Sequence, residues 1–227
     1  MNIANYRGKD GYIADLLTRM TSEERLPQSG PLPSSEDWVS WQAFREAEEL
    51  DDLATLPQIE AEFLRSPPPD RLMNLAFILA GLIANTRSLA GIALFLRMGE
   101  ATPDDPINIH SMISYAEKAR ISECRAFALS HLETKHRLVL GQVISYLGKL
   151  GDPGDIAIIG SLLDEDCWGL GCGFYCAIAL KEIGHPDALP YLRRAVDRHR
   201  KARKKVDKDT RNWSAWAIEK IMMEKLS

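Results

Sequence analysis

Three cysteines and a histidine lie close together in the C-terminal half of the chain, and these residue types can bind a soft metal ion. Cys167, Cys172 and Cys176 precede His185. Thiolates and an imidazole form tetrahedral zinc sites, but four and three residues between successive cysteines are not the spacings of a zinc knuckle. Cys172 and Cys176 also fall on the face of a helix that we expect to be buried, where free cysteine packs as a small apolar residue. We therefore expect buried thiols and no metal site.

Other patterns that would indicate catalysis are missing from the sequence. It contains no nucleophile elbow, no HExxH metal motif and no carboxylate pair in a constrained context. The segment GLGCG, from Gly169 to Gly173, is superficially similar to a phosphate-binding loop. It lacks the preceding strand and the following Lys-Ser/Thr, and it lies where a helix begins. We expect no catalytic residue, no cofactor and no enzymatic activity.

Length and composition are those of an ordinary globular protein. The 227 residues, 45% of them hydrophobic and 26% charged, can build one large core. The N-terminus lacks an apolar signal region, and the four cysteines lack a disulfide framework, so we expect a reducing, cytoplasmic location. The longest apolar stretch, residues 72–96, is interrupted by Asn85-Thr86-Arg87-Ser88. This interruption predicts two buried helices and no membrane span.

The pattern along the chain predicts an all-α protein. Helices are expected at about 36–50, 53–65, 70–85, 87–98, 107–119, 121–133, 135–150, 154–163, 168–183, 187–204 and 210–225, with Pro or Gly between many of them. Residues 1–34 are expected to be a weakly structured segment with a short helix at 11–20 and a linker rich in Pro and Ser. Residues 35–227 are expected to form a single domain.

A near-repeat indicates how these helices stack. LGKLGDP at 147–153 returns as LKEIGHP at 180–186, and a period of 33 residues is typical of stacked helix pairs. The unit CGFYCAIALKEIGHPDALPYLRRAV, residues 172–196, resembles the HEAT-like repeat first noted in phycobilisome lyases. The resemblance is clearest over residues 137–222. It implies an armadillo-like, right-handed α-solenoid of about five to six HEAT-like helix pairs, a fold that serves mainly as a binding surface.

Aligning the repeats predicts a partner-binding face. Shifts of 33 and then 38 residues make Gln142, Tyr175 and Trp213 equivalent, and likewise Ser145, Ile178 and Trp216. In helical solenoids these positions usually face the concave surface, where Trp and Tyr supply large contact area at low entropic cost. The candidate binding residues on this face are Gln142, Tyr175, Ile178, Trp213 and Trp216. The alternative is that the two Trp side chains only seal the end of the last repeat.

A basic segment adds a second candidate surface. Residues 193–211 contain ten Lys/Arg and three Asp, a local charge of +7 in a chain of net charge −4, so the rest of the chain carries −11. The candidate partner contacts are Arg198, Arg200, Lys201, Arg203, Lys204 and Lys205. These side chains either meet an acidic partner at the rim of the concave face or form a solvated helix extension and loop.

These observations favour a non-enzymatic module that binds another protein through its concave face, for example a bacterial inhibitor or immunity protein, or an adaptor. The alternative is a nucleic-acid-binding protein that is similar to HEAT-like DNA glycosylases and uses the basic 193–211 segment. The −11 charge elsewhere opposes this alternative, because phosphate contacts dominate affinity for DNA. A third class, bilin-lyase chemistry, is implied by the repeat resemblance alone. The sequence leaves the partner's identity and the oligomeric state open.

Overall fold

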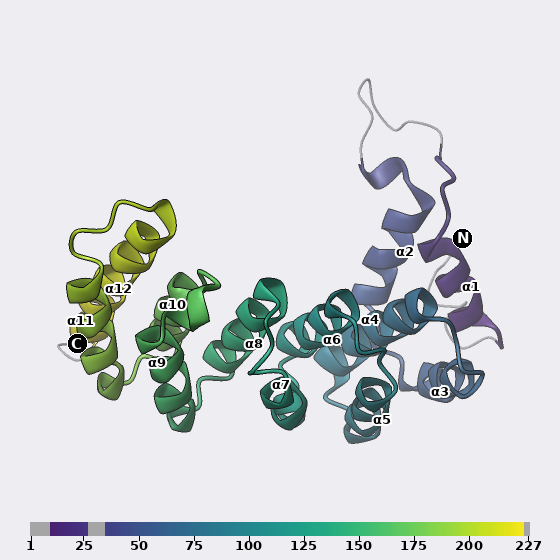
Figure 1. The fold of residues 1–227 in the computed structure, drawn as a ribbon. Helices are drawn as coiled ribbons and strands as arrows, with labels where there is room; N and C mark the ends of the chain where they lie inside the picture. Colours follow the sequence, from purple (N-terminus) through teal and green to yellow (C-terminus); the bar gives the residue numbers. More distant parts are fainter. Residues whose placement is uncertain (1–9, 27–34, 225–227) are drawn as a thin grey trace. The chain divides into compact units, whose positions relative to one another are not determined.

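The computed structural model describes residues 10–26 and 35–224 (Figure 1). Over these residues the chain forms α-helices and short 3₁₀ turns, and a single isolated bridge, between Arg25 and Trp38, is its only β-type pairing. The all-α prediction is therefore confirmed. The predicted linker at 27–34 lies outside the described residues. The α-helices are α1 (Tyr12–Met20), α2 (Val39–Glu48), α3 (Leu56–Leu64), α4 (Pro69–Thr86), α5 (Leu89–Glu100), α6 (Pro106–Ala119), α7 (Arg125–Ser130), α8 (Arg137–Leu150), α9 (Ile156–Asp164), α10 (Gly173–Ile183), α11 (Leu189–Arg198) and α12 (Lys205–Glu224).

The helices group into two compact units that divide between Glu123 and Cys124. The N-terminal unit contains α1 to α6, and the C-terminal unit contains α7 to α12. That residues 35–227 form a single domain stays a prediction.

The short N-terminal helix is part of the core of the N-terminal unit. Helix α1 packs against α2 and α3, and Ile13 and Leu16 on its inner face are fully buried. Two polar contacts add to this packing, because Tyr12 and Arg19 both donate hydrogen bonds of 2.8 Å to Glu46 of α2. Residues 12–20 therefore form a well-packed helix, within a segment that was expected to be weakly structured apart from a short helix at 11–20.

Helix α4 is the centre of the N-terminal unit and packs against α2, α3, α5 and α6. It ends at Arg87, which adopts a left-handed conformation (φ 55°). Ser88 then starts α5 by accepting a hydrogen bond from the backbone of Gly91 at 3.1 Å. The apolar stretch therefore folds as two helices, as predicted. No helix among the described residues is long and apolar enough to cross a membrane.

In the C-terminal unit the helices form two layers (Figure 1). Helices α8, α10 and α12 lie side by side in one layer. Helices α9 and α11 pack against each other in the second layer, and α9 also packs against α10 of the first layer. Small residues set the spacing of the first layer. A Cβ atom added to Gly148 of α8 would lie only 2.6 Å from the Cα of Ala179 in α10, and one added to Gly173 would lie 2.7 Å from Thr210 of α12.

The repeated turn has the same geometry in both copies. Gly151 and Gly184 end α8 and α10 in the left-handed region (φ 73° and 70°), which glycine adopts without strain. In the first copy the side chain of Asp152 accepts a hydrogen bond from the Gly154 backbone at 2.8 Å. In the second copy Nδ1 of His185 accepts one from the Asp187 backbone at 3.3 Å. The two copies are thus equivalent in structure as well as in sequence, and the helix pairs stack as an α-solenoid.

Ion pairs link α7 to the segment before α9, and α9 to α11. Arg125 at the start of α7 binds the carboxylate of Asp155, which is fully buried just before α9. Asp164 at the end of α9 binds Arg194 at 2.6 Å and Arg198 at 3.2 Å, both from α11. The hydrogen bond from Arg194 is the largest influence on the pKa of Asp164 and, together with the positive charges, lowers it.

Two helix limits near the C-terminus differ from the prediction. Helix α11 ends at Arg198 instead of residue 204, and α12 begins at Lys205 instead of residue 210. Residues 199–204 form the turn between them. Crowded like charges at Arg200, Lys201, Arg203 and Lys204 are less unfavourable in a solvated turn than on neighbouring helical positions, where like-charge pairs are destabilising.

Candidate protein-binding surface

The aligned repeat positions fall on the three neighbouring helices α8, α10 and α12. All six of them are at least partly accessible to solvent, and Trp213 is 40% exposed. We call this set the aromatic stripe; it comprises Gln142, Ser145, Tyr175, Ile178, Trp213 and Trp216. The positions immediately after its members include a buried set that faces the core: Val143, Tyr146, Cys176, Ala179, Ser214 and Ala217. The aligned positions are therefore accessible on each of the three helices, and their role as a concave binding face stays a prediction.

The aromatic rings of the stripe pack against neighbouring helices and against each other. The ring of Tyr175 lies over Gly141 of α8, where an added Cβ atom would be 3.1 Å from the ring. Trp213 and Trp216 form an edge-to-face pair with centroids 5.2 Å apart and an interplanar angle of 90°. The ammonium of Lys181 in α10 lies 5.5 Å from the Trp216 ring centre, a cation–π contact. The three rings are therefore each held by a neighbouring side chain or helix.

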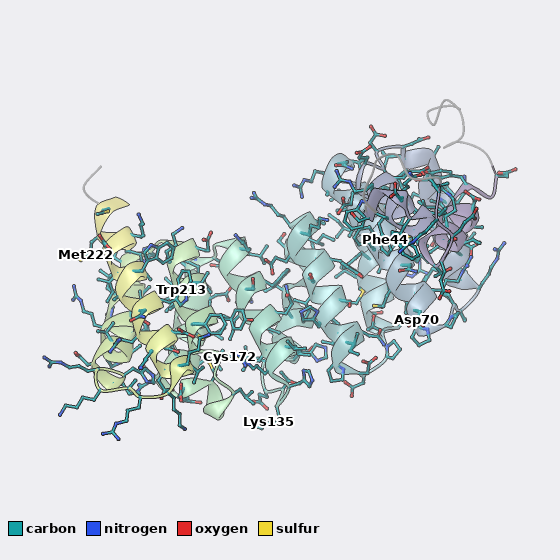
Figure 2. The ribbon with its side chains drawn as sticks, turned by 90° about the horizontal axis from the view of Figure 1, so that it is seen from above. Phe44, Asp70, Lys135, Cys172, Trp213 and Met222 are labelled. Atoms are coloured by element: carbon teal, nitrogen blue, oxygen red, sulfur yellow. The ribbon has the colours of Figure 1, made fainter. Side chains whose placement is uncertain are left out.

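Residues other than the Trp pair cover the core at α12. Thr210, Ser214, Ala217 and Ile221 form the buried face of α12, so these residues cover the core at this helix. Trp213 lies beside that face, where it remains accessible. Figure 2 labels Trp213 on α12 next to α10, and labels Met222 further along α12.

One exposed apolar residue on this surface was missed by the sequence analysis. Leu138 is 60% exposed at the start of α8 and lies four residues before Gln142 and seven before Ser145, so the three share one helix face. The spacing was visible in the sequence. Its equivalents in the next two repeats are Gly171 and Asp209, neither of which is a large apolar residue, so the alignment did not select it.

The predicted basic contacts divide into two groups. Arg198 is occupied within the unit: it donates to the backbone of Leu163 at 2.8 Å and pairs with Asp164. Arg200, Lys201, Arg203, Lys204 and Lys205 are exposed in the turn before α12 or at its first residue. They lie near the aromatic stripe along the chain, since Lys205 and Trp216 are eleven residues apart and share a helix face.

The cysteine cluster is part of the core. All four cysteines are free and buried, and the Sγ atoms of Cys167 and Cys176 are 3.6 Å apart. The hydrogen bond with Cys167 and burial raise the pKa of Cys172, so its thiol stays protonated and a poor metal ligand. Nearby, His185 belongs to the repeated turn. Among the described residues no group of His, Cys, Asp or Glu is arranged to hold a metal ion.

The N-terminal unit has an aromatic surface of its own, which the sequence analysis did not identify. Phe44 of α2, Phe77 of α4 and Tyr115 of α6 form consecutive edge-to-face contacts with centroids 5.1 and 5.4 Å apart. Phe77 and Tyr115 border a cavity of about 50 Å³, which is also lined by the ion pair of Lys118 and Glu48. Burial raises the pKa of Tyr115. No repeat alignment reaches these helices, so their inward faces could not be read from the sequence.

Comparison with known proteins identifies the class of repeat. Residues 174–198 match the PBS lyase HEAT-like repeat, and these residues span α10, the repeated turn and α11. The chain therefore contains a HEAT-like repeat within an all-α solenoid, as the sequence resemblance predicted. HEAT-like repeats generally mediate protein interactions. No curated protein and no solved structure matches the chain.

Proposed function

We propose that this chain is a non-enzymatic protein-binding module and that the aromatic stripe of α8, α10 and α12 is its contact surface. The observation that carries the proposal is the edge-to-face pair of Trp213 and Trp216, which is accessible and fixed beside Lys181. Trp and Tyr dominate binding energy at protein interfaces because they bury much area and lose little conformational entropy. Fixing the rings before binding lowers that cost further.

The chemistry of the stripe supports binding over catalysis. Its largest members are aromatic and aliphatic side chains, which supply contact area and do not transfer protons. The thiols that could act as nucleophiles are buried behind the stripe, and the raised pKa of Cys172 disfavours the reactive thiolate.

A sharper form of the proposal is a bacterial inhibitor or immunity protein that covers an enzyme's active site, or an adaptor that joins two proteins. The charge of the N-terminal unit supports the inhibitor form. Residues 1–123 contain nineteen Asp/Glu and eleven Lys/Arg, a net charge of −8, which would attract a basic enzyme and speed its capture. The same charge repels nucleic acid, so we propose a protein as the partner. The four free cysteines support a reducing, cytoplasmic location.

Affinity capture from source-cell lysate treated with nuclease tests the proposal. Wild type is compared with a Tyr175→Ala/Trp213→Ala/Trp216→Ala variant and with Met222→Ala. Met222 is 47% exposed on the same helix as the Trp pair, and nine residues of helix place it opposite Trp213. Circular dichroism first establishes that all three proteins have the same helix content.

We expect wild type and Met222→Ala to retain one protein in stoichiometric amount and the triple variant to lose it. Retention of the same protein by the triple variant would refute the assignment of the stripe. A partner that wild type captures only from a parallel lysate without nuclease would favour the nucleic-acid alternative.

A further inference from the structure

The turn between α11 and α12 carries cations that have no partner within the described chain. Arg200, Lys201, Arg203, Lys204, Lys205 and Lys208 are all exposed. None of their side chains forms an ion pair or hydrogen bond with a described residue. The nearest carboxylates in the sequence, Asp207 and Asp209, lie on α12 and pair with none of them. Six positive charges are therefore left for solvent or a ligand.

This arrangement is not general in the molecule. Among the described residues the Lys and Arg side chains that pair with a carboxylate all lie outside residues 199–208. They include Arg97 with Glu60, Lys149 with Glu182 and Arg194 with Asp164. Exposed pairs contribute little to stability, but they neutralise the surface. None of the six cations of residues 199–208 is neutralised in this way.

Two features make the turn attractive to an anion. Helix α12 begins at Lys205 and extends for 20 residues, so the positive end of its dipole adds to the side-chain charges. The basic residues also adjoin the aromatic stripe. Lys205 and Trp216 share one face of α12, and eleven residues of helix separate them by about 16 Å. A single extended segment of a partner can therefore contact both surfaces.

The geometry of the Trp pair indicates which kind of anion fits. Bases stack on aromatic rings that present an open face. Here the two indoles meet edge to face at 90°, and Lys181 lies over the ring of Trp216. Two perpendicular rings offer a corner that suits an aliphatic or aromatic side chain of a protein better than a stack of parallel bases.

We propose that the partner presents an acidic segment with an apolar anchor: the carboxylates bind the cations of the turn and of the first residues of α12 (residues 199–208), and the anchor packs against Trp213 and Trp216. This inference rests on the proposed function of the aromatic stripe and adds the chemistry of its partner. Complementary charge would orient the segment and speed its association, while the anchor would provide most of the affinity.

Fluorescence anisotropy with three labelled probes tests the inference on the full chain. The probes are a peptide of Glu and Leu pairs, its Lys and Leu counterpart, and an oligothymidylate with the same number of negative charges as the first peptide. The variants are a quadruple charge reversal, Lys201→Glu/Arg203→Glu/Lys204→Glu/Lys205→Glu, and a charge-conserving control, Lys201→Arg/Lys204→Arg/Lys205→Arg.

We expect the Glu–Leu peptide to bind wild type and the control more tightly than either other probe does. Charge reversal should weaken its binding roughly tenfold or more, and raising the salt from about 0.1 M to about 1 M should do the same, because the Debye length falls from about 10 Å to about 3 Å. Oligothymidylate binding as tightly as the acidic peptide would overturn the inference, as would absence of binding by that peptide or an unchanged affinity after charge reversal.

The lysate experiment separates failure of this inference from failure of the proposed function. If the partner is lost by the Trp variant but kept by the charge-reversed variant, the stripe binds protein and the acidic-segment inference is wrong. If the Trp variant keeps the partner, the proposed function itself is wrong.

Discussion

The close approach of α8 and α10 predicts a strong effect of one methyl group. Substituting Gly148→Ala would place Cβ 2.6 Å from both the Cα and the Cβ of Ala179. Carbon atoms prefer separations of about 3.5–4.0 Å, so the two helices must move apart by about 1 Å. Overpacking of this kind costs about 1–3 kcal/mol, whereas replacing glycine by alanine within a helix gains about 1 kcal/mol. Because the obstacle is backbone, we expect a net loss of about 1–2 kcal/mol.

Gly141→Ala in the same helix is the matched control. Its Cβ would be 3.1 Å from the outer ring atoms of Tyr175, which can move because they lie at the end of a side chain. The gain in helix propensity should then prevail, with an effect between zero and about 1 kcal/mol of stabilisation.

Thermal unfolding of the full chain, followed by circular dichroism, measures both variants. At about 2–4 °C per kcal/mol for a chain of this size, Gly148→Ala should lower Tm by about 2–8 °C, and Gly141→Ala should leave it unchanged or raise it. Equal rises in Tm for both variants would refute the packing of α8 against α10 described here.

Three further predictions concern buried and paired groups. Arg125→Ala leaves the buried carboxylate of Asp155 unpaired and should lower the free energy of unfolding by about 2–4 kcal/mol, less than for a fully buried pair because Arg125 is 38% exposed. Urea unfolding should show a smaller loss of stability for Asp155→Ala, which removes the buried charge itself. A larger loss for Asp155→Ala than for Arg125→Ala would contradict this explanation. The lowered pKa of Asp164 means that its stabilising effect is complete above about pH 4 and disappears as the pH falls through the lowered pKa. The difference in Tm between wild type and Asp164→Asn should therefore shrink below about pH 4, and a constant difference down to pH 2 would exclude this linkage. Because all four thiols are buried, Ellman's reagent should label none in the folded chain and all four in denaturant, whereas rapid labelling of the native protein would show that the cluster is accessible.

The fold near the clear repeat could be predicted from the sequence because its signals are local. Gly184 and Pro186 mark a turn whose geometry depends on nearest neighbours, and the period of 33 residues places the next copy. The same alignment identified Tyr175, Trp213 and Trp216 as accessible. The predicted end of α11 and start of α12 were both wrong, by six and five residues. No Pro or Gly marks the turn between them, because crowded positive charges end α11 there.

Features that depend on contacts between residues far apart in the chain could not be predicted from the sequence. Arg125 and Asp155 are 30 residues apart, and neither residue type nor spacing marks them as partners. The aromatic surface of Phe44, Phe77 and Tyr115 arises from the packing of α2, α4 and α6, where the repeat has no recognisable sequence. The division of the chain after Glu123 likewise depends on which helices contact each other, and the sequence has no linker there.

We propose above all that the partner binds the face of α12 that carries Trp213 and Trp216. The most direct measurement is site-specific photo-crosslinking in the source cell, with benzoylphenylalanine in place of Trp213 in one protein and of Met222 in the other. Both positions are exposed on α12, but they point in opposite directions. We expect a single crosslinked protein from position 213 and none from position 222. Equal crosslinking from both positions, or crosslinking from position 222 alone, would contradict it.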